Sequence, residues 1–226
     1  MDWDKEKDNF YNFIIENRVV GFFDEALTLK SGRKSYWYVN WRTVAEDVFL
    51  LDKVSNFLLS FVEHLNLKPN CFYGVPEGAT KLGIITQYKW AFQDEKIKPG
   101  KYVLSMGRGK PKDHGAPKDK YFLGIPQGKV ILVEDTTTTG SSMLKAIDDL
   151  MDNKVNIIAA IGLTNRNEVR DDGNTVEEAI KKKGIQYYAM SNAIDLIPQL
   201  HPNEAISNHL ETYFKKYGTR EIKFFD

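Results

Sequence analysis

Short apolar runs alternate along most of the chain with longer stretches in which apolar residues recur every three or four positions. The short runs predict buried strands, and the longer stretches predict helices with one apolar face. Strands are expected at residues 71–74, 103–106, 130–133, 157–163 and 186–189. Helices are expected at about residues 50–65, 82–90, 142–151 and 175–183. Because strands and helices take turns, we predict an α/β fold with a doubly wound parallel sheet.

The first part of the chain follows a different pattern. Phe10, Phe13 and Ile14 are spaced as on one face of a helix, and two β-rich runs follow at residues 27–29 and 36–39. No internal repeat or low-complexity linker divides the chain, so we expect a single domain. Its expected parts are a small N-terminal hood, an α/β core, and a tail that packs back, at about residues 1–48, 49–195 and 196–226.

Composition narrows the possible functions only slightly. The chain of 226 residues has 31 Lys and Arg against 31 Asp and Glu, so its formal net charge is zero. This balance gives no support to binding of nucleic acid or of an anionic membrane. No apolar run reaches the roughly 18–20 residues of a membrane span, and the single cysteine, Cys71, suits a reducing compartment. We expect a cytoplasmic protein.

The candidate chemistry is concentrated at residues 130–142, where a buried strand leads into a helix. Two carboxylates, Glu134 and Asp135, follow four apolar residues, and the carboxyl ends of strands in such sheets face the ligand crevice. A hydroxyl-rich loop then ends at a helix start near residue 141, where free N–H groups favour an anion. Gly140 lets the backbone approach that anion closely. The segment predicts a site for ribose hydroxyls and a phosphate, although an ordinary strand–turn–helix joint has similar residues.

This segment resembles the signature for 5-phosphoribosyl 1-diphosphate (PRPP) in type I phosphoribosyltransferases, which has an apolar strand, two acids and a Thr-Thr-Gly turn followed by Ser. No Lys follows Gly140, which separates the loop from the P-loop of nucleotide triphosphatases. The resemblance implies the type I phosphoribosyltransferase fold, with the acids on the ribose hydroxyls and the loop on the 5′-phosphate. The implied PRPP-binding residues here are Glu134, Asp135, Thr136, Thr137, Thr138, Thr139, Gly140, Ser141 and Ser142.

A second segment, at residues 107–118, is rich in Gly, Pro and cations and has no apolar anchor, which is typical of a surface loop. Its run Lys112-Asp113-His114-Gly115 resembles the lid loop of orotate phosphoribosyltransferases. In that family the lid closes over the diphosphate, usually at the neighbouring subunit's site, so the resemblance implies a homodimer. The implied catalytic residues are Lys112, Asp135, Arg108 and His114, and Lys110 joins the lid residues that bind PRPP.

A third segment, at residues 29–40, is similar to the base-binding segment of the same family. There a Lys reaches toward the substrate and aromatic residues wall in the pyrimidine, which suits the anionic orotate. Arg166 stands where the family has an Arg that hydrogen-bonds a base carbonyl. The implied orotate-binding residues are Lys30, Tyr38, Val39, Thr138 and Arg166. In the glycine-containing joint at residues 74–81, which resembles the diphosphate-binding loop, Lys81 is the expected cation.

The resemblance covers about residues 20–195 and implies an orotate phosphoribosyltransferase. Such an enzyme converts orotate and PRPP to orotidine 5′-monophosphate and diphosphate in pyrimidine biosynthesis. It implies Mg²⁺ bound mainly through PRPP, and no pair of histidines has metal-ligand spacing that would indicate a metal site in the protein itself. Because the chain ends at Asp226, we expect no fused orotidylate decarboxylase domain. A purine phosphoribosyltransferase and a non-catalytic PRPP-sensing regulator are the alternatives.

Overall fold

The computed structural model describes residues 3–109 and 121–225 of the chain. At its centre is a sheet of four parallel strands in the order β3-β6-β7-β8. The strands are β3 (Cys71–Gly74), β6 (Lys129–Thr137), β7 (Asn156–Asn165) and β8 (Tyr187–Asn192). All four overlap the apolar runs that predicted them, and the predicted α/β fold with a parallel sheet is confirmed.

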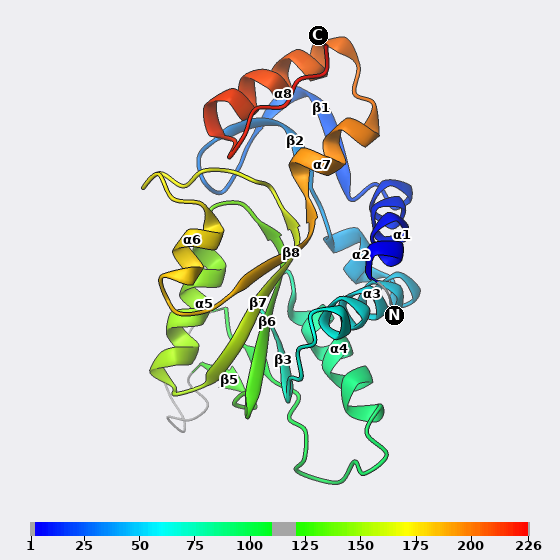
Figure 1. The fold of residues 1–226 in the computed structure, drawn as a ribbon, viewed down its shortest axis with the longest axis vertical. Helices are drawn as coiled ribbons and strands as arrows, with labels where there is room; N and C mark the ends of the chain where they lie inside the picture. Colours follow the sequence, from blue (N-terminus) through cyan, green and yellow to red (C-terminus); the bar gives the residue numbers. More distant parts are fainter. Residues whose placement is uncertain (1–2, 110–120, 226) are drawn as a thin grey trace.

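Helices cover both faces of this sheet (Figure 1). One face carries α3 (Val48–His64) and α4 (Thr80–Phe92), and the other carries α5 (Ser141–Asp152) and α6 (Val176–Lys181). Side chains alternate between the two faces along a strand. Accordingly Ile131 and Val133 of β6 belong to the core of the first face, whereas Val130 and Leu132 belong to that of the second. The strand is apolar at four successive positions because both of its faces are buried.

The loops after β3 and β6 diverge. These strands are neighbours in the sheet, yet β3 is followed by α4 on one face and β6 by α5 on the other. In α/β sheets, ligands bind in the crevice that opens at the carboxyl ends of two such strands. The fold therefore places residues 75–79 and 138–140 on opposite sides of one crevice.

An upper layer, made of β1 (Val20–Thr28), β2 (Lys34–Val39) and α8 (Glu204–Tyr217), lies over the carboxyl ends of the central strands (Figure 1). β1 and β2 form an antiparallel pair, and both are longer than the runs that predicted them. α8 packs on this pair, with the ring of Phe214 stacked on that of Trp37 at 5.7 Å between centroids. Residues from the two ends of the chain thus build one layer.

The other elements connect these parts. They are α1 (Trp3–Glu16), α2 (Arg42–Glu46), β4 (Met106–Gly107), β5 (Phe122–Leu123), α7 (Ala193–Leu196) and the 3-10 helix η2 (Ile197–Leu200). Among the helices in the described ranges, none combines the length and apolar composition needed to cross a membrane.

The strand predicted at residues 103–106 is wrong in length and place. Only β4 forms there, and it pairs with β5 outside the central sheet. The reason is the amide of Gln87 on α4, whose Nε2 donates to the Val103 carbonyl at 3.1 Å while its Oε1 accepts from the Phe72 N–H of β3 at 2.9 Å. A side chain thus takes backbone groups that a further strand of the sheet would have used.

Candidate active site

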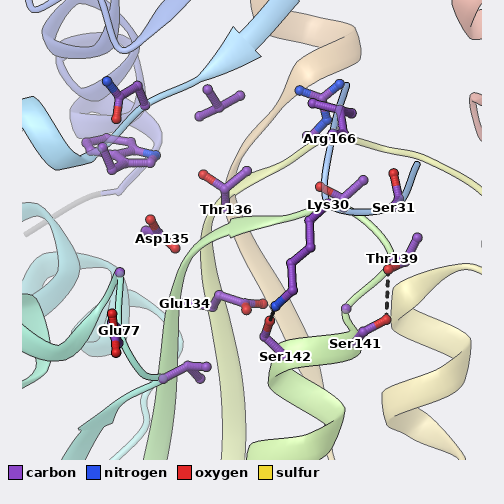
Figure 2. Close-up of a pocket in the computed structure, with 18 of the residues that line it drawn as sticks. Lys30, Ser31, Glu77, Glu134, Asp135, Thr136, Thr139, Ser141, Ser142 and Arg166 are labelled. Carbon is purple, nitrogen blue, oxygen red and sulfur yellow. Dashed lines mark hydrogen bonds between the residues drawn. The ribbon is translucent and has the colours of Figure 1, made fainter. Parts of the chain in front are cut away.

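A cavity of about 380 Å³ occupies the crevice between the loops that follow β3 and β6 (Figure 2). The carboxyl end of β6 and the loop after it line one part of the cavity, and the upper layer contributes residues 29–31, 38 and 39. Its lining comes from residues 29–31, 38–42, 75–78, 134–136 and 138–142, together with Arg166. Segments that are more than 100 residues apart in the sequence therefore meet in one cavity.

The two predicted acids lie within β6, not beyond its end. The expected strand stopped at Val133, whereas β6 continues to Thr137. Glu134 is only 6% exposed. Asp135 lies against Gly78, where an added Cβ would come within 2.5 Å of Asp135 Oδ2. Gly78 therefore leaves room for a carboxylate that both loops of the crevice enclose.

Burial changes the protonation of this acid pair. Desolvation, followed by the neighbouring Asp135, raises the pKa of Glu134 to about 8, although Lys30 acts in the opposite direction. Burial also raises the pKa of Asp135, while Arg42 lowers it. Burial therefore favours the protonated form of Glu134 near neutral pH when no ligand is bound.

Three buried polar atoms of β6 have no hydrogen-bond partner among the described residues, and two of them belong to side chains that line the cavity. These two atoms are Glu134 Oε2 and Thr136 Oγ1. A buried polar atom left without a partner costs about 1–3 kcal/mol. A ligand that brings hydroxyl groups to this point would remove that cost.

The hydroxyl-rich loop ends at the N-terminus of α5. Gly140 adopts a left-handed conformation (φ 68°) as the N-cap and offers no side chain to cap the helix. The first N–H groups of α5 therefore point toward the cavity without a side-chain cap, as an anion site requires. Thr139 Oγ1 and Ser141 Oγ lie 2.9 Å apart and add hydroxyls at the same place (Figure 2).

Not every residue of this run faces the cavity. Thr136, Thr138, Thr139, Gly140, Ser141 and Ser142 line it, but Thr137 is fully buried and does not. We call residues 134–142 with Lys30 the β6 end of the cavity, and Arg166 with Tyr38 and Val39 the Arg166 end.

Lys30, predicted on the orotate side, reaches the β6 end. Figure 2 shows its side chain running from the upper layer down to α5, with its ammonium between Glu134 and Ser142. Its Nζ lies 3.4 Å from Ser142 Oγ. The cation therefore stands where it balances a carboxylate or meets an anion bound at the helix N-terminus.

The Arg166 end is apolar apart from one guanidinium. Val39 is buried, Tyr38 is half-buried, and both line the cavity with Arg166. Arg166 is 2% exposed, and its guanidinium carbon lies 3.6 Å from the ring centroid of Trp37. Its Nε donates to Glu168 Oε1 at 2.7 Å. This end offers a partly apolar lining beside a firmly held cation.

Lys81 does not take the place expected of it. It lies in the first turn of α4, is exposed, and donates from Nζ to the Ala45 carbonyl at 3.1 Å. It is not among the residues that line the cavity, whereas Arg42 at the start of α2 is. The sequence did not indicate Arg42, because no pattern in residues 40–46 predicts a short helix that places this side chain near Asp135.

A second missed cation supports the hydroxyl-rich loop from outside. Arg170, in the connection between β7 and α6, donates from Nη1 to the Thr139 carbonyl. The contact joins residues that are 31 positions apart, so no local motif indicates it. Arg170 thus ties the hydroxyl-rich loop to the connection between β7 and α6.

The predicted lid falls mostly outside the described residues. This applies to Lys110, Lys112 and His114. Arg108 is described and borders a second hollow of about 330 Å³, which shares Lys30, Ser141 and Ser142 with the cavity. Arg108 and Gly109, the last described residues of the predicted lid segment, therefore lie beside the β6 end.

No protein-family model matches the chain. Individual relatives do. The orotate phosphoribosyltransferase of Bradyrhizobium diazoefficiens is 31% identical over 156 residues, which are 65% of this chain and 76% of the relative. The chain belongs to the orotate phosphoribosyltransferase family.

Other members of the orotate phosphoribosyltransferase family are also similar to this chain. The protein of Methanosphaera stadtmanae is 29% identical over 181 residues, which are 80% of this chain and 90% of the relative. The crystal structure of the Francisella tularensis orotate phosphoribosyltransferase matches with a TM-score of 0.68 at 20% identity, over 93% of this chain and 100% of that one. The latter likeness shows a shared fold. The family expected from residues 29–40, 107–118 and 130–142 is confirmed.

Proposed function

We propose that this chain transfers the 5-phosphoribosyl group of PRPP to N1 of orotate, giving orotidine 5′-monophosphate and diphosphate. One observation carries the proposal beyond family membership: a single cavity has unpartnered polar atoms and a helix N-terminus at its β6 end, and apolar side chains beside a guanidinium at its Arg166 end. PRPP needs the first set of groups, and orotate needs the second.

The β6 end suits the phosphoribosyl group. Glu134 Oε2 and Thr136 Oγ1 lack partners in the described parts of the chain and would receive ribose hydroxyls. The N–H groups of α5 and the hydroxyls of residues 138–142 would hold the 5′-phosphate, with Lys30 beside them. The family resemblance gave Lys30 to orotate, but its position supports a role at the phosphate.

The Arg166 end suits the base. Arg166 offers only hydrogen-bond donors, so the group that it meets must present an acceptor such as a ring carbonyl. Tyr38 and Val39 would lie against the ring, and Thr138 lines the cavity between the two ends. A base that carries an exocyclic amine at the same point would be rejected, because two donors would face each other.

The reaction breaks the bond from the anomeric carbon to diphosphate, whose oxygen leaves with the electron pair, and joins that carbon to N1 of orotate. The proton of N1 passes to the departing diphosphate or to water. Positive charge develops on the ribose, and the carboxylate of Asp135 would stabilise it, joined by that of Glu134, whose ionised form the nearby positive charge favours. Negative charge develops on the diphosphate. Arg108, Lys110, Lys112 and His114 of the lid would neutralise or protonate it as they close.

Magnesium would come mainly with PRPP. No three metal-ligating His, Cys, Asp or Glu side chains gather anywhere in residues 3–109 and 121–225. Yet the carboxylates of Glu134 and Asp135 are the hard oxygen donors that Mg²⁺ accepts beside water and phosphate. The residues thus fit a metal held by the substrate with these two acids nearby. When bound, Mg²⁺ would neutralise charge on the diphosphate.

A homodimer in the cytoplasm completes the proposal. Four large apolar side chains are exposed where α3 and α4 meet: Val48 (87%), Phe49 (66%), Tyr88 (52%) and Phe92 (61%). The ion pair from Lys89 Nζ to Asp52 Oδ1, at 2.7 Å, ties the two helices together at this surface. An apolar surface of this kind supports contact with a second subunit, whose lid would then reach this cavity.

The test is an absorbance assay of the purified protein with PRPP, Mg²⁺ and orotate, with hypoxanthine, adenine and uracil in parallel reactions. PRPP-dependent loss of orotate alone is the expected result. Consumption of a purine would keep the β6 end as a PRPP site and overturn the assignment of the Arg166 end. Binding of PRPP without turnover of any base would indicate a PRPP sensor.

A further inference from the structure

The carboxylate of Glu168 accepts hydrogen bonds from three side chains that belong to distant segments of the chain. It is 1% exposed. Its Oε2 accepts from Arg33 Nη1 at 2.8 Å, and its Oε1 accepts from Arg166 Nε at 2.7 Å and from the Tyr213 hydroxyl at 2.8 Å. Arg33 precedes β2, Arg166 follows β7, and Tyr213 belongs to α8. One buried anion thus links the upper layer to the loop that carries Arg166.

The same network leaves only one nitrogen of Arg166 for a ligand. Nη2 donates to Ser35 Oγ and to the Tyr213 hydroxyl, both at 3.2 Å. Nε is held by Glu168, and the face of the guanidinium lies on Trp37. Nη1 makes no hydrogen bond with any residue in the described ranges, and Arg166 lines the cavity. The guanidinium therefore has one orientation, with Nη1 as its available donor.

Tyr213 bridges the cation and the anion in this arrangement. Its hydroxyl donates to Glu168 Oε1 and accepts from Arg166 Nη2. Burial raises the pKa of the Tyr213 phenol, so it remains a donor over the whole working range. Because a guanidinium next to a carboxylate can rotate between single and paired contacts, a third group that holds both fixes their mutual angle.

The charges in the network do not cancel within the buried part. Two guanidiniums share the single buried carboxylate of Glu168. The other anion that contacts Arg33 is Asp171, whose side chain is 90% exposed and therefore strongly screened by water. The Arg166 end thus keeps an excess of positive charge, which favours an anionic ligand.

We propose that Glu168 and Tyr213 are positioning residues for the base, which aim Nη1 of Arg166 into the cavity, so that helix α8 takes part in base recognition without touching the base. This inference rests on the proposed function, because it takes orotate as the ligand at the Arg166 end. A network that only joined α8 to the core would share the same contacts but would not discriminate between the two substrates.

The test compares Tyr213→Phe with Tyr36→Phe. Both remove one hydroxyl at the contact between β2 and α8, but Tyr36 stacks on His209 at 3.7 Å between centroids and has no contact with Arg166. Tyr213→Phe should raise KM for orotate about tenfold, the usual size for a lost hydrogen bond to a charged group, and change KM for PRPP less than about twofold. Tyr36→Phe should leave both KM values unchanged.

A double-mutant cycle separates positioning from general destabilisation. In an Arg166→Ala background, Tyr213→Phe should no longer change KM for orotate, because the residue through which it acts is gone. Ser35→Ala, which removes the other acceptor of Nη2, should shift KM for orotate in the same direction as Tyr213→Phe. Melting temperatures of all variants are measured in parallel.

Four outcomes would overturn the inference. If wild type consumes orotate but Tyr213→Phe leaves its KM unchanged, the positioning role is wrong and the proposed function stands. If Tyr213→Phe raises both KM values equally, or keeps its effect in the Arg166→Ala background, the network is a structural tie only. If wild type consumes no orotate, the proposed function fails first and this inference fails with it.

Discussion

The β6 end and the Arg166 end of the cavity reach their functions by opposite routes. The β6 end is built almost entirely from one continuous segment, and two of its buried polar atoms, Glu134 Oε2 and Thr136 Oγ1, have no partner within the described residues. At the Arg166 end, Nε and Nη2 of the guanidinium are both bonded, by residues as far as 131 positions away. The β6 end therefore gains its missing hydrogen-bond partners from a ligand, whereas the guanidinium at the Arg166 end is already held by the protein.

This difference fits the two substrates. A phosphoribosyl group has many hydroxyl and phosphate oxygens and can satisfy the open donors and acceptors at the β6 end. A flat base presents few polar atoms, so its recognition depends on the exact direction of one donor, and that donor must be held rigidly before binding. Variants at the two ends should therefore affect different steps.

The largest effect is expected at the acid pair. Asp135→Asn removes a charge that the ribose cation requires, so kcat/KM should fall on the order of a hundredfold, as for loss of one electrostatic group in a preorganised site. Steady-state kinetics with both substrates measures this, with Asp8→Asn on the exposed face of α1 as the control. A variant that lost thermal stability but kept its turnover would show that the acid is only structural.

The next effect tests the shape of the loop at the β6 end. Gly140→Ala places a Cβ 2.4 Å from Val176 Cγ2 at a left-handed position, which should lower the free energy of unfolding by about 1–3 kcal/mol and raise KM for PRPP roughly tenfold. Gly173→Ala is the control, since Gly173 is also left-handed (φ 80°) but has open space around it. Equal changes of KM in the two variants would disprove a specific role for Gly140.

A smaller effect should appear in the pH dependence of stability. The pKa of Glu134 is about 8 in the folded protein, against an ordinary value of 4.5. Between these values the folded chain keeps a proton that the unfolded chain has lost, so this group makes stability fall as pH rises from about 4.5 to about 8, by at most about 1.4 kcal/mol per pH unit. Glu134→Gln removes that fall.

Thermal unfolding of wild type and Glu134→Gln from pH 5 to pH 9 would measure this pH dependence of stability. The melting temperature of Glu134→Gln should approach or equal that of wild type at pH 5 and exceed it increasingly up to pH 8. Glu25→Gln, at an exposed position of β1, should follow wild type at every pH. Parallel pH curves for wild type and Glu134→Gln would refute the raised pKa of Glu134.

The smallest effect is expected at Lys81. Because Lys81 Nζ donates to the Ala45 carbonyl outside the cavity, Lys81→Ala should change KM for PRPP less than about twofold, within the range of an exposed contact. Arg42→Ala is the matched comparison, since Arg42 does line the cavity, and its KM for PRPP should rise clearly more. The reverse ranking would restore Lys81 as the diphosphate cation.

Prediction from the sequence succeeded where the information is local. The apolar run of β6, the acids after it, Gly140 and the helix start of α5 are neighbours in the sequence, so one pattern indicates both the elements and their chemistry. The strand predicted at residues 103–106 does not join the sheet, because the amide of Gln87 takes the place of a strand partner beside β3. That replacement depends on how α4 packs, which no periodicity reveals.

The same distinction applies to the site. Arg166 was recognised by its resemblance to the family, but Glu168, Tyr213 and Arg170 were not, because their contacts join segments that meet only in the folded chain. The destination of Lys30 was missed for a related reason: its segment is recognisable, yet the direction of a long side chain depends on the groups around it. Long-range polar networks are the part of this site that its sequence does not display.

The most direct test of this two-ended account is a crossed measurement of both KM values in wild type, Arg166→Lys and Gly140→Ala. Arg166→Lys keeps the charge but loses the planar fork, so it should raise KM for orotate and leave KM for PRPP nearly unchanged. Gly140→Ala should do the opposite. If each variant moved both KM values by the same factor, the cavity would be one undivided site and the account would be contradicted.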